Sequence, residues 1–293
     1  MVSRSKVALA ALLLAAGLLS GAEKLPVCAG LGPVANIVSA VGGDAVRVTF
    51  MLPEGRSPHD HAPGPRELRQ ALKAKLFFTT GMPYEERITR ALKGKVPVAD
   101  ISAGIRRIPL EEHHHPGGNH GHHHDHDHDA ESGDPHVWLS PVNCAVMAAN
   151  AARELGKLLP ARKDEFRRRA EAFAVKMRKL HENTLGKLAP YKGRSFFVYH
   201  PAFGYFAALY GLHQRAVELG GRETTPARLA QVVKEARRSG VKVIFVQKQF
   251  NPASARALAD AIKGEVLELD PLAADVAANL DAVCGALIKG FTR

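Results

Sequence analysis

The sequence has few cysteines, few aromatic residues and no nucleic-acid motif. Its three cysteines, Cys28, Cys144 and Cys284, are odd in number and far apart, which excludes a disulfide framework and a CxxC metal knuckle. One disulfide is compatible with three cysteines, but the spacing does not say which two would pair. Aromatic residues make up 6% of the chain, and no basic motif is interleaved with them. The formal net charge of +11 therefore indicates a solvated basic surface, and we expect no nucleic-acid partner.

Long apolar runs are also lacking, apart from one at the N-terminus. Arg4 and Lys6 precede an apolar stretch over residues 7–19, and small residues follow up to Ala22. A membrane-spanning helix needs about 20 apolar residues, so this stretch is too short, whereas small residues at this position suit cleavage. We therefore expect residues 1–22 to be a secretory signal peptide and the rest of the chain to be exported.

Short β-rich runs alternate with helical patterns along the remaining chain, which predicts parallel α/β layers. The expected strands cover residues 27–31, 46–52, 76–79, 96–101, 195–199, 215–219, 241–246 and 265–269. Helices are expected over residues 65–75, 84–93 and 141–159, and from near residues 203, 226, 252 and 276. Each half of the chain is thus a (βα)4 unit, and we predict an α/β protein of two lobes.

A long amphipathic helix is predicted between the two halves. Apolar residues such as Phe166, Phe173 and Met177 follow helical spacing along one face, while the other face is densely charged. The expected organisation is an N-terminal lobe over residues 23–160, a linking helix over 161–189 and a C-terminal lobe over 190–293.

Residues 111–129 read EEHHHPGGNHGHHHDHDHD and contain no apolar residue. Such a segment cannot bury itself, so we expect a mobile loop. Neutral imidazoles and carboxylates are ligands for zinc, copper and nickel. Because a mobile chain loses conformational entropy when it fixes a metal, we expect a collector or sensor of zinc here rather than the principal site. Its candidate accessory ligands are His113, His114, His115, His120, His122, His123, His124, His126 and His128.

Four other metal-capable residues follow predicted strands. His59 lies in LPEGRSPHDHAP, His136 in GDPHVWLSP, His200 after SFFVY and Asp270 after VLEL. The carboxyl ends of strands line the ligand crevice in open α/β sheets, so two residues from each half could meet across a cleft. Three imidazoles and one carboxylate are a sound tetrahedral zinc set. We therefore predict the principal metal site from these four residues.

Nearby residues leave alternatives open. His61 stands two residues after His59 and could replace it as the ligand. Asp134 and Glu268 are candidate acceptors for imidazole N–H groups, a role that metal-bound histidines usually need filled. His213 fits a loop and is expected to be structural.

The sequence resembles the metal-binding proteins of bacterial ABC importers, of the ZnuA/TroA-like type that delivers zinc. The resemblance covers essentially the whole mature chain and rests on VGGDAVRVTFMLPEGRSPHDHAP, TTGMPYEE, DPHVWLSP, FVYHPAFGYFAALYGL, FVQKQFNPASARALA and LELDPL. It implies two (βα)4 lobes joined by one long helix, with metal between them and little hinge movement. It also implies a periplasmic, non-catalytic monomer that hands zinc to a membrane permease, with ligands His59, His136, His200 and Asp270.

Two positions depart from the family pattern, namely His61, where tyrosine is common, and Gln247, where glutamate is often found. Manganese-selective relatives commonly carry glutamate where His200 stands here, and a third imidazole suits zinc better. Two readings share the same residues: a manganese-binding, metal-buffering or adhesin homologue, and a secreted zinc hydrolase. A hydrolase would need a general base beside a metal-bound water, and no HExxH motif occurs.

Overall fold

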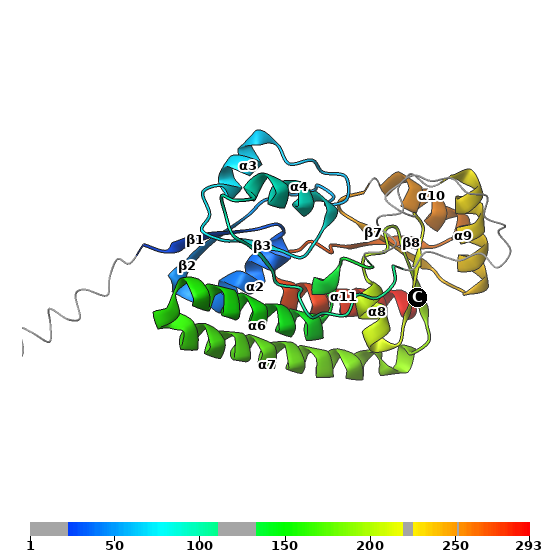
Figure 1. Ribbon diagram of the computed structural model, residues 1–293. Helices are drawn as coiled ribbons and strands as arrows, with labels where there is room; N and C mark the ends of the chain where they lie inside the picture. Colours follow the sequence, from blue (N-terminus) through cyan, green and yellow to red (C-terminus); the bar gives the residue numbers. More distant parts are fainter. Residues whose placement is uncertain (1–22, 111–132, 219–224, 251) are drawn as a thin grey trace, which may run out of the picture.

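The computed structural model describes residues 23–110, 133–218, 225–250 and 252–293 (Figure 1). The predicted signal peptide and the histidine-rich segment 111–129 lie outside the described residues. Within the described ranges, no helix combines the length and apolar character needed to cross a membrane.

The first half of the chain forms a parallel sheet of four strands in the order β2-β1-β3-β4. The elements run β1 (Leu25–Ala29), α2 (Gly32–Gly42), β2 (Val46–Phe50), α3 (Pro65–Ala71), β3 (Phe77–Thr79), α4 (Pro83–Leu92) and β4 (Val98–Asp100). The 3-10 turn η2 (Val137–Leu139) and helix α6 (Pro141–Leu158) follow. Ser140 caps α6 because its side chain accepts from the Asn143 N–H, and Pro141 opens the helix.

The second half repeats the arrangement, with a parallel sheet in the order β6-β5-β7-β8. Its elements are β5 (Ser195–Val198), α8 (Gly204–Tyr210), β6 (His213–Ala216), α9 (Pro226–Arg238), β7 (Val243–Gln247), α10 (Pro252–Ile262), β8 (Glu265–Leu269) and α11 (Val276–Phe291). The predicted α/β class with two (βα)4 lobes is confirmed. The strand expected at residues 215–219 was wrong by two to three residues, since β6 ends at Ala216 and leaves Glu218 just beyond its end.

Helix α7 (Lys163–Leu188) joins the two lobes, as the long amphipathic pattern predicted. It buries Phe166, Phe173 and Met177 and leaves its charged side in solvent. It packs against α2 and α6 of the first lobe and against α8 and α11 of the second, so it runs beneath both (Figure 1).

One hydrophobic core extends through both lobes and along this helix. On the second sheet, Phe196 and Phe245 face this common core, while Phe197 and Ile244 face the separate layer formed by α9 and α10. The lobes are also tied by hydrogen bonds, for example from Trp138 Nε1 to the Pro271 carbonyl at 2.7 Å. A shared core of this kind holds the strand ends of the two lobes in a fixed relation.

Helix α2 was not among the helices named from the sequence. Its residues GPVANIVSAVG include two glycines and four β-branched residues, which have low helix propensity, and Asn36 and Ser39 are its only polar side chains, so the helical period is weak. Most of the helix is buried, so tertiary packing supplies what propensity lacks.

The three cysteines are buried free thiols in the common core. Burial raises the pKa of Cys28 to about 11 and that of Cys144 to about 12. Thiols with such pKa values are inert at neutral pH, so these cysteines act as small apolar core residues.

Candidate metal centre

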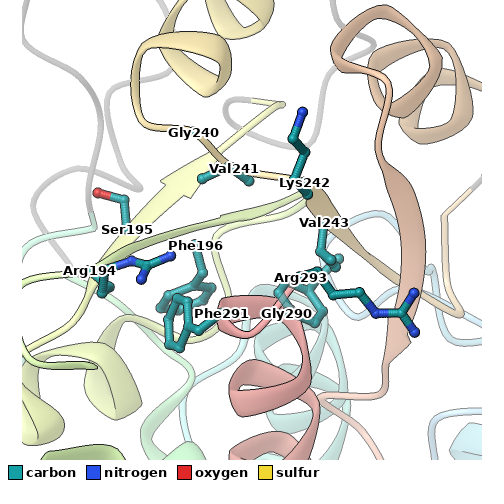
Figure 2. A pocket seen from close by; sticks show the side chains of 11 residues that line it. Arg194, Ser195, Phe196, Gly240, Val241, Lys242, Val243, Gly290, Phe291 and Arg293 are labelled. Atoms are coloured by element: carbon teal, nitrogen blue, oxygen red, sulfur yellow. The ribbon is translucent and has the colours of Figure 1, made fainter. Parts of the chain in front are cut away.

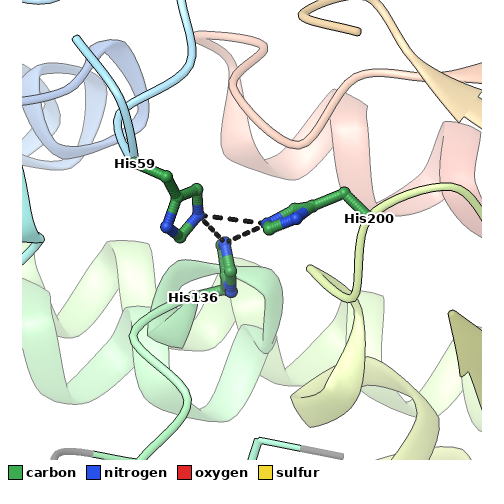
Figure 3. A group of neighbouring side chains, drawn as sticks. All are labelled: His59, His136 and His200. Atoms are coloured by element: carbon green, nitrogen blue, oxygen red, sulfur yellow. Dashed lines mark hydrogen bonds between the residues drawn. The ribbon is translucent and has the colours of Figure 1, made fainter. Parts of the chain in front are cut away.

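Three histidines from different loops meet between the lobes (Figure 3). His59 lies in the segment between β2 and α3, His136 immediately precedes η2, and His200 follows β5. Their Nε2 atoms are 3.1 Å apart for His59 and His136, 3.0 Å for His59 and His200, and 3.3 Å for His136 and His200. Two of these residues come from the first lobe and one from the second.

These distances fit a tetrahedral metal ion. Zinc binds imidazole nitrogen at about 2.0–2.1 Å, which places two nitrogens of a tetrahedral site roughly 3.3 Å apart. The observed separations of 3.0–3.3 Å are close to that value for all three pairs. The donors therefore already form one face of a zinc tetrahedron.

Two buried carboxylates determine which nitrogen of each ring is protonated. His136 Nδ1 lies 2.8 Å from Asp134 Oδ1, and His200 Nδ1 makes a short hydrogen bond to Glu218 Oε1. Each carboxylate is 1% exposed and accepts the Nδ1 proton. Both rings therefore present the Nε2 lone pair to the shared centre, in the arrangement that orients metal-bound histidines elsewhere.

This protonation pattern leaves the Nε2 atoms of His136 and His200 without a hydrogen between them. Two lone pairs 3.3 Å apart repel each other. His59 can donate at most one Nε2 proton, so it cannot satisfy both neighbours. A cation at the centre of the three rings would remove this conflict, so the cluster is a candidate metal site by its chemistry as well as by its spacing.

Burial sets the charge of these groups. It is the main cause that holds the pKa of His59 and of His136 well below the ordinary value, and the neighbouring His200 adds to the effect. Both imidazoles are thus neutral, as metal ligands must be. Burial also raises the pKa of Asp134 to about 7. A cation bound on the far side of the His136 ring favours the ionised form of that carboxylate.

The backbone of His200 is held by a buried amide. Gln247 Nε2 donates to the His200 carbonyl at 2.6 Å, and Gln247 Oε1 accepts from the His200 N–H at 3.1 Å. The ring of Phe250 stacks on the His200 imidazole, with centroids 5.1 Å apart. An ionised glutamate at position 247 could not donate to that carbonyl, whereas glutamine binds both the N–H and the carbonyl of His200.

The other residues predicted from the sequence lie outside this cluster. His61 Nε2 lies 2.6 Å from Glu67 Oε1, which directs its ring toward α3, so it is His59 that joins the group. Glu268 is 57% exposed and pairs with Lys248, and no contact with an imidazole is recorded for it among the described residues. Its expected role beside a histidine stays a prediction. The histidines from His113 to His128 fall outside the described residues.

Asp270 also lies apart from the three histidines, whose ligand atoms are all within 4.8 Å of one another. Its Oδ1 accepts from Gln249 Nε2 at 3.1 Å and from the Leu272 N–H at 3.0 Å, and its Oδ2 is 3.7 Å from Lys248 Nζ. The structure thus brings together three of the four predicted ligands, and direct coordination by Asp270 stays a prediction.

The sequence analysis assigned no role at the site to Glu218, Gln247 or Gln249. Glu218 was not predicted because it follows a different strand from His200. A carboxylate at the end of a buried strand is nevertheless a usable signal of a site.

The pocket around the histidines is formed by both lobes. Its lining consists of Ser57, Pro58, His59, His136, His200, Gln249, Phe250, Pro271 and Leu272.

A second hollow lies at the opposite, amino-terminal edge of the second sheet (Figure 2). It carries basic side chains, but Arg194 lies over the Phe291 ring at 5.2 Å and Arg293 pairs with Glu265. In Figure 2, Lys242 and Arg293 point away from Arg194 and Phe291. These cations do not converge on one point, so the histidine cluster is the better candidate site.

The model of a family described as "Zinc-uptake complex component A periplasmic" matches residues 27–282. The chain belongs to this family. Among curated proteins, the zinc-binding protein AdcA of Streptococcus pyogenes serotype M3 is 25% identical over 251 residues, covering 82% of this chain and 49% of AdcA. The chain thus spans about half the length of the first curated relatives that it matches.

Solved structures of zinc-uptake component A proteins match over nearly their full length. A crystal structure of ZnuA is 29% identical with a TM-score of 0.81, covering 92% of this chain and 99% of that chain. A ZnuA deletion mutant with zinc bound is 30% identical with a TM-score of 0.79, covering 92% and 98% respectively. The two-lobe arrangement with its long helix is therefore shared with members of the family.

Proposed function

We propose that this chain is the zinc(II)-binding component of an ABC importer, which captures zinc in the periplasm and delivers it to a membrane permease. The observation that carries the proposal is the convergence of three imidazole nitrogens from both lobes. Their separations are close to those expected around one zinc ion. Family membership supports it. Because one chain supplies all three donors, we propose that the protein works as a monomer.

The donor set favours zinc over manganese. Imidazole nitrogens suit zinc, whereas carboxylate and carbonyl oxygens suit manganese. Three neutral imidazoles, two of them backed by buried carboxylates, make a nitrogen-rich face. We propose that an oxygen from the Asp270 side of the cleft completes a tetrahedral set.

The same geometry supports binding without catalysis. A zinc hydrolase needs a general base within reach of a metal-bound water. The described lining of the pocket contains no carboxylate, and Asp134 and Glu218 are each committed to the Nδ1 side of an imidazole. We therefore propose that zinc is the cargo of the protein and that no substrate is hydrolysed.

The described residues that flank the histidine-rich segment are held beside this site. The Asp134 N–H donates to the Ile108 carbonyl at 2.8 Å, and Tyr205 Oη donates to the Asp134 carbonyl at 2.9 Å. Leu110, the last described residue before the segment, stands two residues after Ile108, and Gly133, the first described residue after it, directly precedes Asp134. We propose that the segment collects zinc weakly near the entrance to the tight site.

The test compares the full chain with a variant lacking residues 113–128. Zinc binding is measured by competition with a chelator of known affinity, together with the metal content of untagged protein purified from its native compartment. We expect one tight zinc equivalent in both proteins and additional weak equivalents in the full chain alone. Loss of the tight equivalent on deletion would make the segment the principal site, and a dominant manganese content would overturn the metal assignment.

A further inference from the structure

Lys248 lies between two carboxylates at the carboxyl end of the second sheet. It directly follows β7, and its Nζ is 3.5 Å from Glu268 Oε1 and 3.7 Å from Asp270 Oδ2. Glu268 belongs to β8, and Asp270 is the first residue after it. Residues two apart along an extended chain point to the same side, so one ammonium can reach both carboxylates. One of the two, Asp270, is a predicted metal ligand.

The two carboxylate oxygens of Asp270 have different partners. Oδ1 accepts from Gln249 Nε2 at 3.1 Å and from the Leu272 N–H at 3.0 Å. Within the described part of the chain, the partner recorded for Oδ2 is the Lys248 ammonium, at a distance too long for a hydrogen bond. A cargo ion can therefore bind Oδ2 while both hydrogen bonds of Oδ1 remain. The one contact that it must replace is the contact with Lys248.

Glu268 gives this ammonium a second place. Zinc(II) and an ammonium repel each other, so both cannot lie close to Oδ2 without a cost. The side chains of Lys248 and Glu268 are 51% and 57% exposed, so solvent leaves them free to change their geometry. Because Glu268 Oε1 is already 3.5 Å from Nζ, the ammonium can move away from Asp270 and keep a carboxylate partner.

We propose that Lys248 is a competing cation at the Asp270 ligand, which moves toward Glu268 when the cargo ion binds and speeds the release of that ion. This inference rests on the proposed zinc-binding function, with Asp270 as a ligand, and adds a group that tunes it. A positive charge beside the bound ion raises the free energy of the bound state. The ion therefore dissociates faster than it would from the same ligands alone, which suits a protein that must give up its cargo.

Two substitutions on protein lacking residues 113–128 should act in opposite directions. Lys248→Met keeps the apolar stem and removes the charge, and we expect zinc affinity to rise about two- to fivefold, the range of an exposed ion pair. Dissociation of zinc into excess chelator should slow by a similar factor. Glu268→Gln removes the second place of the ammonium, so zinc affinity should fall by about the same factor.

The double variant shows whether Glu268 acts through Lys248. Glu268→Gln should have a smaller effect in the Lys248→Met background than in the parent protein, because the ammonium that it positions is gone. The difference between Lys248→Met and the parent should shrink as ionic strength rises, since salt screens exposed charges. A change in packing would produce no such salt dependence.

The matched control is Lys242→Met. Lys242 is exposed and directly precedes β7, so it has the same place as Lys248 at the opposite end of the same strand. Its replacement should leave zinc affinity and dissociation unchanged. Lys248→Arg keeps the positive charge and should behave like the parent protein.

Lys248→Gln provides a second neutral variant if the methionine variant fails to fold, and the same changes are expected from it. Unchanged or weaker zinc binding in the neutral Lys248 variants, with one tight zinc equivalent in the parent, would reject the inference alone. A gain in affinity that does not depend on salt would also reject it. Absence of a tight zinc equivalent from the parent protein would instead reject the proposed function.

Discussion

The two lobes have the same strand order, yet they hold the histidines of the central cluster in different ways. In the first lobe, His136 is held by Asp134, two residues earlier, through both its backbone N–H at 2.9 Å and its ring at 2.8 Å. In the second lobe, His200 is held by Glu218 after β6 and by Gln247 at the end of β7. The support of His136 is local in sequence, whereas the support of His200 links three adjacent strands, β5, β6 and β7.

The difference shows how one fold can bring two unlike segments to one cluster of imidazoles. A parallel sheet places the carboxyl ends of its strands side by side, so the second lobe can build a support from residues 18 and 47 positions away from His200. The first lobe uses a short turn instead, and the Asp134 N–H in this turn donates to the Ile108 carbonyl. Each kind of support can therefore be removed by its own substitution.

Removal of one imidazole from either lobe should have the largest effect. His200→Ala leaves a position that water can fill, so zinc should still bind, but more weakly by about two to three powers of ten, or roughly 3–4 kcal/mol. His136→Ala should cause a comparable loss, because the two rings have equivalent places around the ion. Chelator competition on protein lacking residues 113–128 measures both effects.

The control for this test is His213→Ala. His213 is exposed at the start of β6, the edge of the sheet opposite the strand ends that carry the site. Its replacement should leave zinc affinity unchanged. If His200→Ala bound zinc as tightly as the parent protein, the ion would not lie between the lobes and the proposed site would fail.

Removal of the carboxylate supports should have a smaller effect. We expect Asp134→Asn and Glu218→Gln to lower zinc affinity about 10- to 100-fold each, the usual range for groups that orient metal-bound histidines. An amide that turns its NH2 group to Nδ1 favours the tautomer with Nε2 protonated, which competes with the metal. The measurement is zinc affinity, with the melting temperature of the zinc-free protein as a check on folding.

The two supports can be compared directly in this experiment. If the lobes contribute equally, both variants should lose affinity to a similar degree, and their combined loss should be close to the sum of the two free energies, because each carboxylate contacts a different ring. Full zinc affinity in Glu218→Gln would show that the cross-strand support does not act on the metal.

The fold was largely predictable because its signals are periodic. Alternating β-rich and helical patterns indicated two (βα)4 lobes, and the buried face of α7 indicated the long helix. Helix α2 was not predicted because only Asn36 and Ser39 give it a polar side, which leaves a weak amphipathic period. The pairing of β5 with both β6 and β7 depends on contacts distant in sequence, and no local pattern encodes it.

The site was predictable to the extent that its groups are local. His59, His136 and His200 follow strands, and Asp134 stands two residues from its partner, so sequence reasoning named all four. Glu218 was absent from the prediction because its relation to His200 exists only after the two strands pair. The orientation of Asp270 toward Gln249 is likewise set by the loops after β7 and β8, which the sequence does not place relative to each other.

A third buried carboxylate, Glu85 in the first lobe, supports no histidine and should have the smallest effect. Its Oε2 accepts from Thr79 Oγ1 at 2.7 Å and from the N–H groups of Thr80 and Met82, each at 2.9 Å, while its Oε1 has no partner among the described residues. Burial raises the pKa of Glu85, so the fold disfavours its charged form. The group therefore contributes stability below the ordinary pKa of glutamate, and this contribution is lost as pH rises through the folded-state value. Glu85→Gln has no such charge, so its stability relative to the parent should rise with pH, reaching an advantage on the order of 1 kcal/mol at neutral pH. Urea unfolding of zinc-free protein at several pH values measures this gap. The exposed neighbour variant Glu86→Gln should show no comparable trend, and a gap for Glu85→Gln that stays constant with pH would mean that Glu85 keeps its charge throughout.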